Sequence, residues 1–236
     1  MKKERLSSIL EDLESRLRGP KPGLAAQLRM APNPRPGQKT YLEVLDTCRP
    51  AAVLILLYPR RGDLHIVLTR RTSEVDHHRG QVSLPGGEVD AGETIVEAAL
   101  REAREEIGVR PEGARVLGVM TPLYIPASNY CITPVVAAMP RRPVFRRAPA
   151  EVAEVIELPL EELLDPATVR REVWTLRGRK TDIPFFFYRG HKIWGATAMV
   201  LAEFVAIAGG GRTDGSEGGA PLPKKTIRAG RKERRA

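Results

Sequence analysis

The segment from residue 87 to residue 109, GEVDAGETIVEAALREAREEIGV, constrains the fold more than any other part of the chain. Thr94 and Glu97 have the spacing of a capping box, which predicts that a helix begins near Ile95. Gly108 is suited to end that helix in a left-handed conformation. The apolar residues between these ends recur at helical spacing and are Val96, Ala99, Leu100, Ala103 and Ile107. The segment therefore predicts one amphipathic helix with a continuous apolar stripe.

Another face of this helix carries three carboxylates, Glu102, Glu105 and Glu106, at spacings i, i+3 and i+4. Carboxylates stacked in this way repel one another, and a bound divalent cation removes that cost. Oxygen ligands suit Mg²⁺ or Mn²⁺, and Mg²⁺ commonly bridges carboxylates to substrate phosphates. A solvated acidic helix face is the plain alternative. The Pro-Gly-Gly entry at 85–87 favours the metal, because it lets backbone approach a phosphate or cation near the helix start.

The same segment fits a pattern of glycine, five residues, glutamate, seven residues, then Arg-Glu-apolar-any-Glu-Glu-any-Gly-apolar. The fixed positions are Gly87, Glu93, Arg101, Glu102, Glu105, Glu106 and Gly108, with Ala103 and Val109 at the apolar places. This is the Nudix box, so the chain resembles the Nudix hydrolases, which cleave a nucleoside diphosphate linked to a further group. The resemblance implies an α+β fold, an α/β/α sandwich around a mixed β-sheet. It also implies a small-molecule nucleoside diphosphate derivative as substrate.

The resemblance further implies metal-assisted attack by water, with Mg²⁺ or Mn²⁺ as the cofactor. The expected metal ligands are Glu102, Glu106, Glu105 and the carbonyl of Gly86. The general base that takes the proton from the water is expected to be Glu105 or a glutamate on a later loop. For the later loop the candidates are Glu151 and Glu154, and the sequence leaves this choice open.

Arg101 and Glu93 form a further expected contact at the site. They stand eight residues apart in the box, and we expect the pair to brace the loop before the helix against the helix itself. An ordinary surface ion pair is the alternative and would contribute little stability.

The substrate prediction depends on residues 67–87, VLTRRTSEVDHHRGQVSLPGG. They resemble the signature that precedes the box in the coenzyme A pyrophosphatase branch of the family. The positions that match are Leu68, Thr69, Arg71, Gly80, Pro85, Gly86 and Gly87. The resemblance implies coenzyme A or a derivative as substrate, and 4′-phosphopantetheine with adenosine 3′,5′-bisphosphate as products. The expected substrate-binding residues are Arg70, Arg71, His78, Arg79 and Gly87.

Four positions depart from that signature, and they keep other substrates open. Val67, Thr72 and Leu84 are mild changes, whereas Asp76 stands where an arginine could pair with phosphate. A Nudix hydrolase of ADP-ribose, dinucleotide polyphosphates or nucleoside triphosphates is therefore one alternative. A second alternative is a non-catalytic Nudix-fold binding module whose basic C-terminal tail contacts nucleic acid, although the complete set of box carboxylates speaks against it.

The formal charge of +9 is concentrated at the end of the chain. Residues 209–236 hold eight Lys or Arg and three Asp or Glu, and their Gly, Pro and Ser content predicts disorder. Such a tail could contact nucleic acid or another acidic partner. A dispensable, solvated extension is the favoured interpretation, and the tail has no interleaved aromatic residues of the kind that stack on bases. Elsewhere in the chain nucleic-acid binding is not expected.

The chain is predicted to have three parts: an N-terminal helix with a proline-rich, irregular lead-in (1–40), a Nudix hydrolase domain (41–208) and the basic tail (209–236). Within the first two parts the patterns predict helices over 5–18, 159–164 and 196–207. Strands are expected over 51–58, 64–70, 115–121, 130–138, 171–177 and 183–189, the first two as a hairpin.

Only two cysteines occur, Cys48 and Cys131, without a metal-binding spacing. We expect both to be free, buried thiols in a reducing compartment. No run of about 18 apolar residues appears, so no membrane span is expected and the cytoplasm is the predicted location. The histidines His65 and His191 are expected to be structural or exposed, and the oligomeric state is open.

Overall fold

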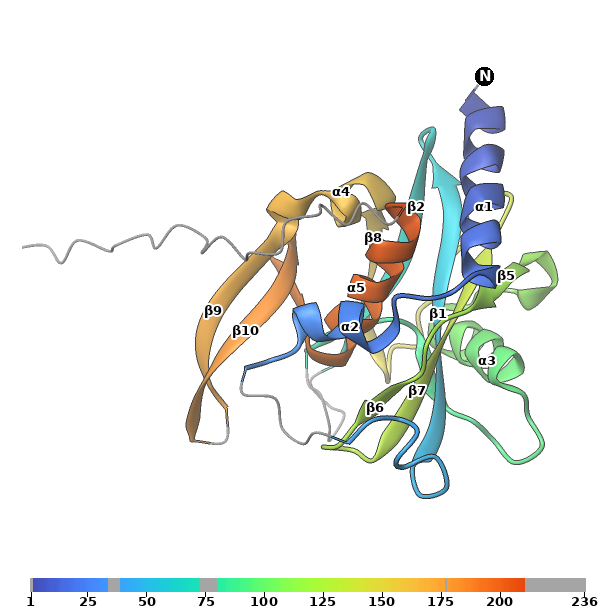
Figure 1. The fold of residues 1–236 in the computed structure, drawn as a ribbon. Coiled ribbons are helices and arrows are strands. Elements are labelled where there is room, and N and C mark those ends of the chain that lie inside the picture. The colour runs from blue at the N-terminus through green and yellow to red at the C-terminus, as the bar shows by residue number, and fades with distance from the viewer. Residues whose placement is uncertain (1, 34–38, 73–79, 177, 211–236) are drawn as a thin grey trace, which may run out of the picture.

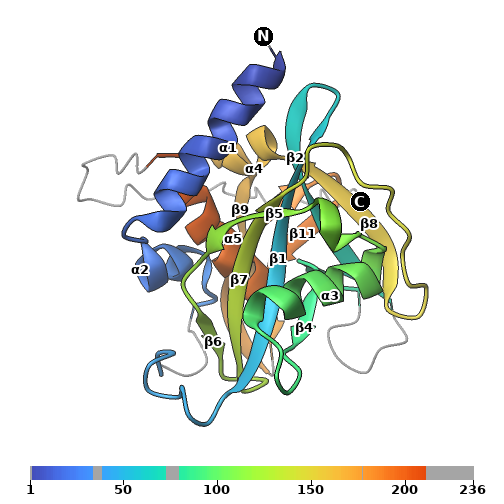
Figure 2. The ribbon, with the colours of Figure 1, turned by 90° about the vertical axis from the view of Figure 1, so that its right-hand side faces the viewer.

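The computed structural model describes residues 2–33, 39–72, 80–176 and 178–210. Within these residues a mixed eight-stranded sheet forms the centre, with helices on both faces (Figure 1). The helix α3 (Ile95–Ile107) packs on one face, whereas α1 (Lys2–Arg18) and α5 (Gly195–Ala208) pack on the other. Figure 2, turned by 90°, shows α3 lying across the strands. The predicted α/β/α sandwich around a mixed sheet is confirmed.

Two long strands at the centre of this sheet form the predicted hairpin. β1 (Arg49–Arg60) pairs antiparallel with β2 (Asp63–Arg71). Arg61 and Gly62 join them with φ angles of 54° and 96°. Two consecutive positive φ angles are typical of the tight turns whose twist matches that of the flanking strands.

The other strands attach around this hairpin. On the far side of β1 lies β7 (Tyr130–Ala138), which runs parallel to it. The shorter or outer strands are β3 (Val82–Ser83), β4 (Gly86–Glu88), β5 (Arg115–Val119), β6 (Leu123–Ile125) and β8 (Val152–Pro159). β3 and β8 pair with β2, β4 pairs with β1, and β5 and β6 pair with β7.

Side chains alternate along β1 between two cores. Leu54 and Leu56 are buried in the core beneath α3, while Ile55 and Leu57 are buried in the core shared with α1 and α5. Because successive residues of a strand point to opposite faces, a strand covered by helices on both sides reads as one apolar run. This explains the uninterrupted apolar stretch in the sequence.

A second sheet follows in the chain after the short helix α4 (Leu160–Leu164). It is antiparallel and, within the described residues, has the order β11 (His191–Trp194), β10 (Arg179–Tyr188), β9 (Val169–Leu176). The strand β9 lies at the outer edge of the molecule (Figure 1). The predicted strands and closing helix in this region are confirmed with shifted boundaries.

The lead-in was expected to be irregular, and this prediction is wrong for its first part. It contains α2 (Gly23–Gln27) and a 3₁₀ turn, Leu28–Met30. The buried Gln27 amide donates to the Glu203 carboxylate of α5 and to the Thr121 carbonyl, both at 2.9 Å. These long-range hydrogen bonds anchor the segment, which its many prolines alone would leave irregular.

The N-terminal helix is also part of the main body. Leu13 and Leu17 of α1 are buried in the same core as Phe204 of α5. Residues before position 40 therefore contribute to the same core as the central sheet and α5.

The prediction that the cysteines are free thiols is wrong. Cys48 and Cys131 form a disulfide, with their Cα atoms 5.7 Å apart. Pro50 of β1 lies opposite Cys131 of β7 in the parallel register, which brings the two cysteines together across 83 residues of sequence. The argument for a reducing compartment from free thiols therefore loses its basis.

Two further predictions concern membrane spans and the segments that lie outside the described residues. No helix among them is both long and apolar enough to span a bilayer. The basic tail beyond residue 210 and the segment with Asp76, His78 and Arg79 lie outside the described residues.

Candidate active site

The helix that carries the acidic residues begins and ends as its sequence predicts. The Thr94 amide donates to the Glu97 carboxylate at 2.8 Å, and the Glu97 amide donates to the Thr94 hydroxyl at 3.3 Å. Gly108 caps the other end with a φ of 70°. The capping box and the left-handed glycine thus fix where the carboxylates of α3 lie.

Glu106 is the most deeply buried carboxylate of α3. Only 3 % of its surface is exposed, and its Oε2 atom has no hydrogen-bond partner among the described residues. The pKa of Glu106 is raised to about 8, mainly by burial and also by the charges of Glu102 and Glu151. The Arg71 cation and the Gly86 amide act in the opposite direction on this pKa. Four segments therefore converge on the Glu106 carboxylate: α3 itself, β2, β4 and the loop before β8.

Glu102 lies beside the glycine-rich entry. A Cβ atom added to Gly87 would come within 2.4 Å of the Glu102 carboxylate, so any larger residue at 87 would displace that carboxylate. Burial also raises the pKa of Glu102, while its hydrogen bond from Arg101 lowers it. The glycine-rich entry predicted from the sequence therefore lies against a carboxylate of α3.

Arg101 joins the loop before α3 to the helix. Its Nε and Nη2 atoms donate to the two oxygens of Glu93 at 2.9 and 3.0 Å, and Nη2 also donates to the Glu88 carbonyl at 2.9 Å. Its Nη1 atom donates to Glu102 and Glu105 at 2.8 and 3.1 Å. The expected pair of Arg101 with Glu93 is confirmed, and the pairing lowers the pKa of Glu93.

The two later glutamates that sequence reasoning left open lie in different places. The Thr72 amide donates to the Glu151 carbonyl at 3.0 Å, which holds residue 151 beside the end of β2. There the Glu151 charge acts on both Glu102 and Glu106. Glu154 instead accepts a hydrogen bond from Arg70 Nε at 3.0 Å and lies 3.4 Å from His191 Nε2.

The two arginines at the end of β2 are separated in the same way. Arg71 acts electrostatically on Glu106, and its buried Nε atom has no hydrogen-bond partner among the described residues. Arg70 pairs with Glu154, next to the core that contains Leu68 and Ile156. Since neighbouring strand residues point to opposite faces, Arg71 faces the α3 carboxylates and Arg70 faces away from them.

Sequence reasoning missed one contact in this region. His191 was expected to be structural or exposed, with no particular partner named. It lies beside Glu154, and with Arg70 it borders a cavity of about 450 Å³. This cavity lies between the two sheets and is also lined by Gln81, Lys192 and Trp194. The contact joins β11 of the second sheet to β8 of the first, and no local sequence pattern could have shown it.

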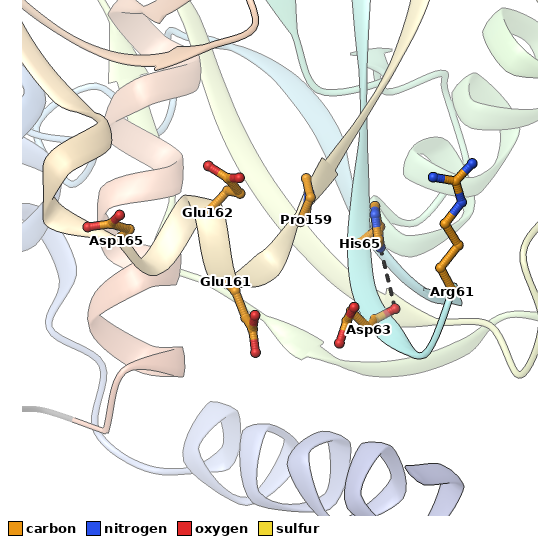
Figure 3. A pocket seen from close by; sticks show the side chains of 7 residues that line it. All are labelled: Arg61, Asp63, His65, Pro159, Glu161, Glu162 and Asp165. Carbon is orange, nitrogen blue, oxygen red and sulfur yellow. Dashed lines mark hydrogen bonds between the residues drawn. The ribbon is translucent and has the colours of Figure 1, made fainter.

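A second cavity, of about 370 Å³, lies at the opposite end of β2 (Figure 3). Its lining is mainly acidic and comes from the hairpin turn and α4: Arg61, Asp63, His65, Pro159, Glu161, Glu162 and Asp165. His65 is buried and contacts the Asp63 carbonyl at 3.4 Å, the structural role expected for it. Eight steps of a strand separate Asp63 from Arg71, roughly 26 Å, so this cavity is remote from the α3 carboxylates.

The described carboxylates are chemically suited to a hard cation, but they are not arranged as a complete set of metal ligands. Within the described ranges, no group of three or more His, Cys, Asp or Glu side chains has a metal-binding arrangement. Glu102 and Glu105 both accept from Arg101, whereas Glu106 has an oxygen without a partner. Oxygen donors of this kind are those that Mg²⁺ and Mn²⁺ prefer.

Comparison with known proteins identifies the family. The NUDIX domain model matches residues 49–177, more than half of the chain. The chain belongs to the Nudix family. The Nudix hydrolase NudL of Photorhabdus laumondii, described as uncharacterized, is 34% identical over 178 residues, which are 75% of this chain and 90% of that protein. NudL of an Enterobacter species, described in the same way, is 36% identical over 167 residues, or 68% and 83%.

A solved Nudix hydrolase, RenU of M. smegmatis, is similar over 48% of this chain and 72% of its own, with 26% identity and a TM-score of 0.42. Family membership supports hydrolysis of pyrophosphate bonds in nucleoside diphosphate derivatives, with a divalent metal ion as cofactor. Small-molecule nucleotides are accordingly the substrate class of this Nudix hydrolase.

Proposed function

We propose that this Nudix hydrolase cleaves the pyrophosphate bond of coenzyme A or its derivatives, giving 4′-phosphopantetheine and adenosine 3′,5′-bisphosphate. The observation that carries the proposal is the signature upstream of the box, which spans the end of β2 and the start of β4. Its Arg71 acts on Glu106, and its Gly87 packs against Glu102. The residues that suggest the substrate are therefore next to the carboxylates that suggest the chemistry.

We assign the divalent cation to Glu102 and Glu106, with help from Glu105 and the Gly86 carbonyl. The partnerless oxygen of the buried Glu106 is the observation that supports this assignment. When bound there, Mg²⁺ or Mn²⁺ would neutralise charge on the diphosphate and lower the pKa of an attacking water. A buried carboxylate oxygen without a hydrogen-bond partner is costly in a metal-free protein, and this is a reason to expect a ligand.

Glu151 is our choice for the general base. It lies near Glu102 and Glu106, as the electrostatic effect on both shows, whereas Glu154 is paired with Arg70. Glu105 remains the other candidate, but it is bound to Arg101. A base must come within hydrogen-bond reach of the water it deprotonates, and Glu151 meets this condition best if water is bound beside the metal ligands.

The remaining residues position these groups. Arg101 and Glu93 hold the loop that carries Gly87 and Glu88 against α3. Arg71, as a cation facing the same carboxylates, is our choice for contact with the diphosphate, because guanidinium groups bind phosphate oxygens strongly. Arg70 is assigned a secondary role, since it faces the other side of the strand. His78 and Arg79 remain predictions from sequence.

The test is product analysis by mass spectrometry with Mg²⁺ and separately with Mn²⁺. The panel contains coenzyme A, ADP-ribose, NADH, diadenosine polyphosphates and dGTP. Preferred release of 4′-phosphopantetheine from coenzyme A is the expected result. Preference for another compound would overturn the assignment of coenzyme A as substrate but not the assignment of the chain as a hydrolase. Cleavage of none of the compounds would favour a non-catalytic binding module.

Variants test the residue roles. Glu106→Gln should lower kcat by at least about a hundredfold, because it removes a charged metal ligand. Glu112→Gln, on the exposed turn after α3, is the matched control and should leave kcat unchanged. Among the candidate bases, Glu151→Gln should lower kcat more than Glu105→Gln or Glu154→Gln. Equal rates for Glu151→Gln and the wild type would exclude Glu151 as the base.

A further inference from the structure

The outer strand of the second sheet has an unpaired edge. β9 pairs with β10 on one side, and among the described residues no strand pairs with its other side. Its first five residues are all exposed. An exposed strand edge of eight residues offers a row of backbone donors and acceptors to another strand.

Apolar residues are exposed on this strand as well. Val169 and Val173 are 37% and 67% exposed, and they lie four residues apart, so they point to the same face. Charged residues stand between them: Arg170 and Arg171, then Glu172. Charges on an edge strand usually prevent pairing with other strands, so a partner must complement this particular order of charges.

We propose that β9 pairs antiparallel with β9 of a second copy of this chain, about a two-fold axis through Arg171. In that register Arg170 of each copy stands opposite Glu172 of the other, and Val169 stands opposite Val173. The two-fold axis repeats each of these pairs, so the contact contains two ion pairs and two apolar pairs. Opposite charges and β-branched residues across strands both stabilise an antiparallel pair.

The charges already present in one chain agree with this register. Arg171, which would meet its own copy, donates to Asp182 at 2.9 and 2.7 Å, so its charge is compensated. Arg170 lies over the Phe187 ring at 3.9 Å and has no salt bridge to a described carboxylate. Arg170 is therefore the cation of β9 that a partner carboxylate would complement. Glu172 accepts hydrogen bonds within its own chain from Trp174 Nε1 at 2.8 Å and Lys192 Nζ at 2.6 Å, both at its Oε2 atom, so its Oε1 atom is the one that would meet Arg170 of the partner copy.

Neighbouring registers fit less well. An axis through Glu172 would place two glutamates against each other and Arg170 opposite Trp174. An axis through Val173 would leave the arginines opposite Thr175 and Leu176. Like charges directly opposite are destabilising, and unmatched charges gain nothing. The register through Arg171 is the one that pairs both the charges and the valines.

The test uses two charge reversals on the full chain, with mass measured by sedimentation over a concentration series. Wild type should form dimers. Arg170→Glu and Glu172→Arg should each weaken the dimer about tenfold or more, because each places like charges opposite twice.

Mixed in equal amounts, the two variants should form a heterodimer. The glutamate introduced in one variant then meets the arginine introduced in the other, and the unchanged Arg170 of the second meets the unchanged Glu172 of the first. Both cross-strand pairs are therefore of opposite charge again. Arg110→Glu, an exposed charge reversal elsewhere, is the matched control and should associate like wild type.

The register has its own test. Arg171→Cys should form a disulfide-linked dimer under mild oxidation, while Val173→Cys should not, since residue 173 faces residue 169 of the partner. Circular dichroism verifies that each variant is folded. A wild type that stays monomeric, folded variants that remain apart when mixed, or a dimer in which Arg171→Cys does not cross-link would each overturn the proposal. None of these measurements depends on hydrolysis, so they remain decisive if the proposed substrate is wrong.

Discussion

Arg101 binds both carboxylate oxygens of Glu93 through two of its nitrogens, at 2.9 and 3.0 Å. The same side chain holds the Glu88 carbonyl and the carboxylates of Glu102 and Glu105. One guanidinium thus connects the loop before α3 with the acidic face of that helix. A planar fork is required for this, and an ammonium cannot reproduce it.

Replacing Arg101 with lysine should therefore impair activity more than stability. The loop that carries Gly87 would lose its alignment with Glu102, and small displacements near reacting groups can cost roughly ten- to a hundredfold in rate. We expect kcat/KM to fall within that range while thermal unfolding changes little. Arg104→Lys, on an exposed position of the same helix, should leave both unchanged. Equal activity of the two variants would contradict a positioning role for Arg101.

The buried Glu106 should make stability depend on pH in the absence of metal. Its pKa is 4.5 in the unfolded chain and about 8 in the folded protein, mainly through burial. Between these values the folded state retains a proton that the unfolded state has lost, so this residue favours folding less and less as the pH rises. Below the unfolded-state pKa the group is protonated in both states and has no effect.

Urea unfolding with a chelator present, at several pH values, measures this effect. The free energy of unfolding of Glu106→Gln relative to wild type should increase from pH 4.5 to pH 8 and then level off. A relative stability that is constant over this range would show that Glu106 is not buried as a carboxylate.

Two adjacent glycines should respond differently to alanine. At Gly86, with a φ of 157°, a Cβ would lie 2.3 Å from the Ala52 carbonyl and would clash with backbone of β1. We expect Gly86→Ala to destabilise the fold by about 2–4 kcal/mol or prevent folding. At Gly87 the nearest atoms belong to the flexible end of Glu102.

Gly87→Ala should consequently fold but bind metal more weakly, because the Glu102 carboxylate must move away. Thermal unfolding and a Mn²⁺ titration distinguish the two effects. If Gly87→Ala binds Mn²⁺ like wild type, Glu102 is not held at the metal by this glycine.

Local patterns in the sequence predicted the parts of the site that lie close together in the chain. The capping box of α3 and the pair of Arg101 with Glu93 both fall within one short segment, and both are confirmed. Glu151 and Glu154 could not be told apart, because their difference depends on how β8 pairs with the distant strand β2. Glu154 lies in β8 opposite Arg70, whereas Glu151 precedes the strand beside Thr72.

The same reasoning explains the errors elsewhere. Prolines predicted an irregular lead-in, but the hydrogen bond from Gln27 to Glu203 crosses 176 residues of sequence. Similarly, the pairing of Cys48 with Cys131 depends on the parallel register of β1 and β7. Periodicity and spacing describe neighbours along the chain and contain no information on which distant strands become neighbours in a sheet.

Gln27 should contribute to the stability of the whole fold. Its amide is one donor to the buried Glu203 carboxylate, and the Gly23 amide is another. Gln27→Ala removes the first donor and leaves a buried acceptor undersatisfied, which costs about 1–3 kcal/mol. Chemical unfolding should reveal this loss, whereas Leu28→Ala, at an exposed position, should have a smaller effect. A neutral Gln27→Ala would mean that the lead-in does not support the core.

The disulfide should make stability sensitive to reducing agents. A bond that closes a loop of 83 residues restricts the unfolded chain and typically contributes about 2–4 kcal/mol. Dithiothreitol should lower the unfolding midpoint of the wild type accordingly. The double variant Cys48→Ser, Cys131→Ser should start from the lower midpoint and show no response to the reductant. Identical midpoints for wild type with and without reductant, together with two titratable thiols in the unreduced protein, would show that the cysteines are free, as the sequence alone had suggested.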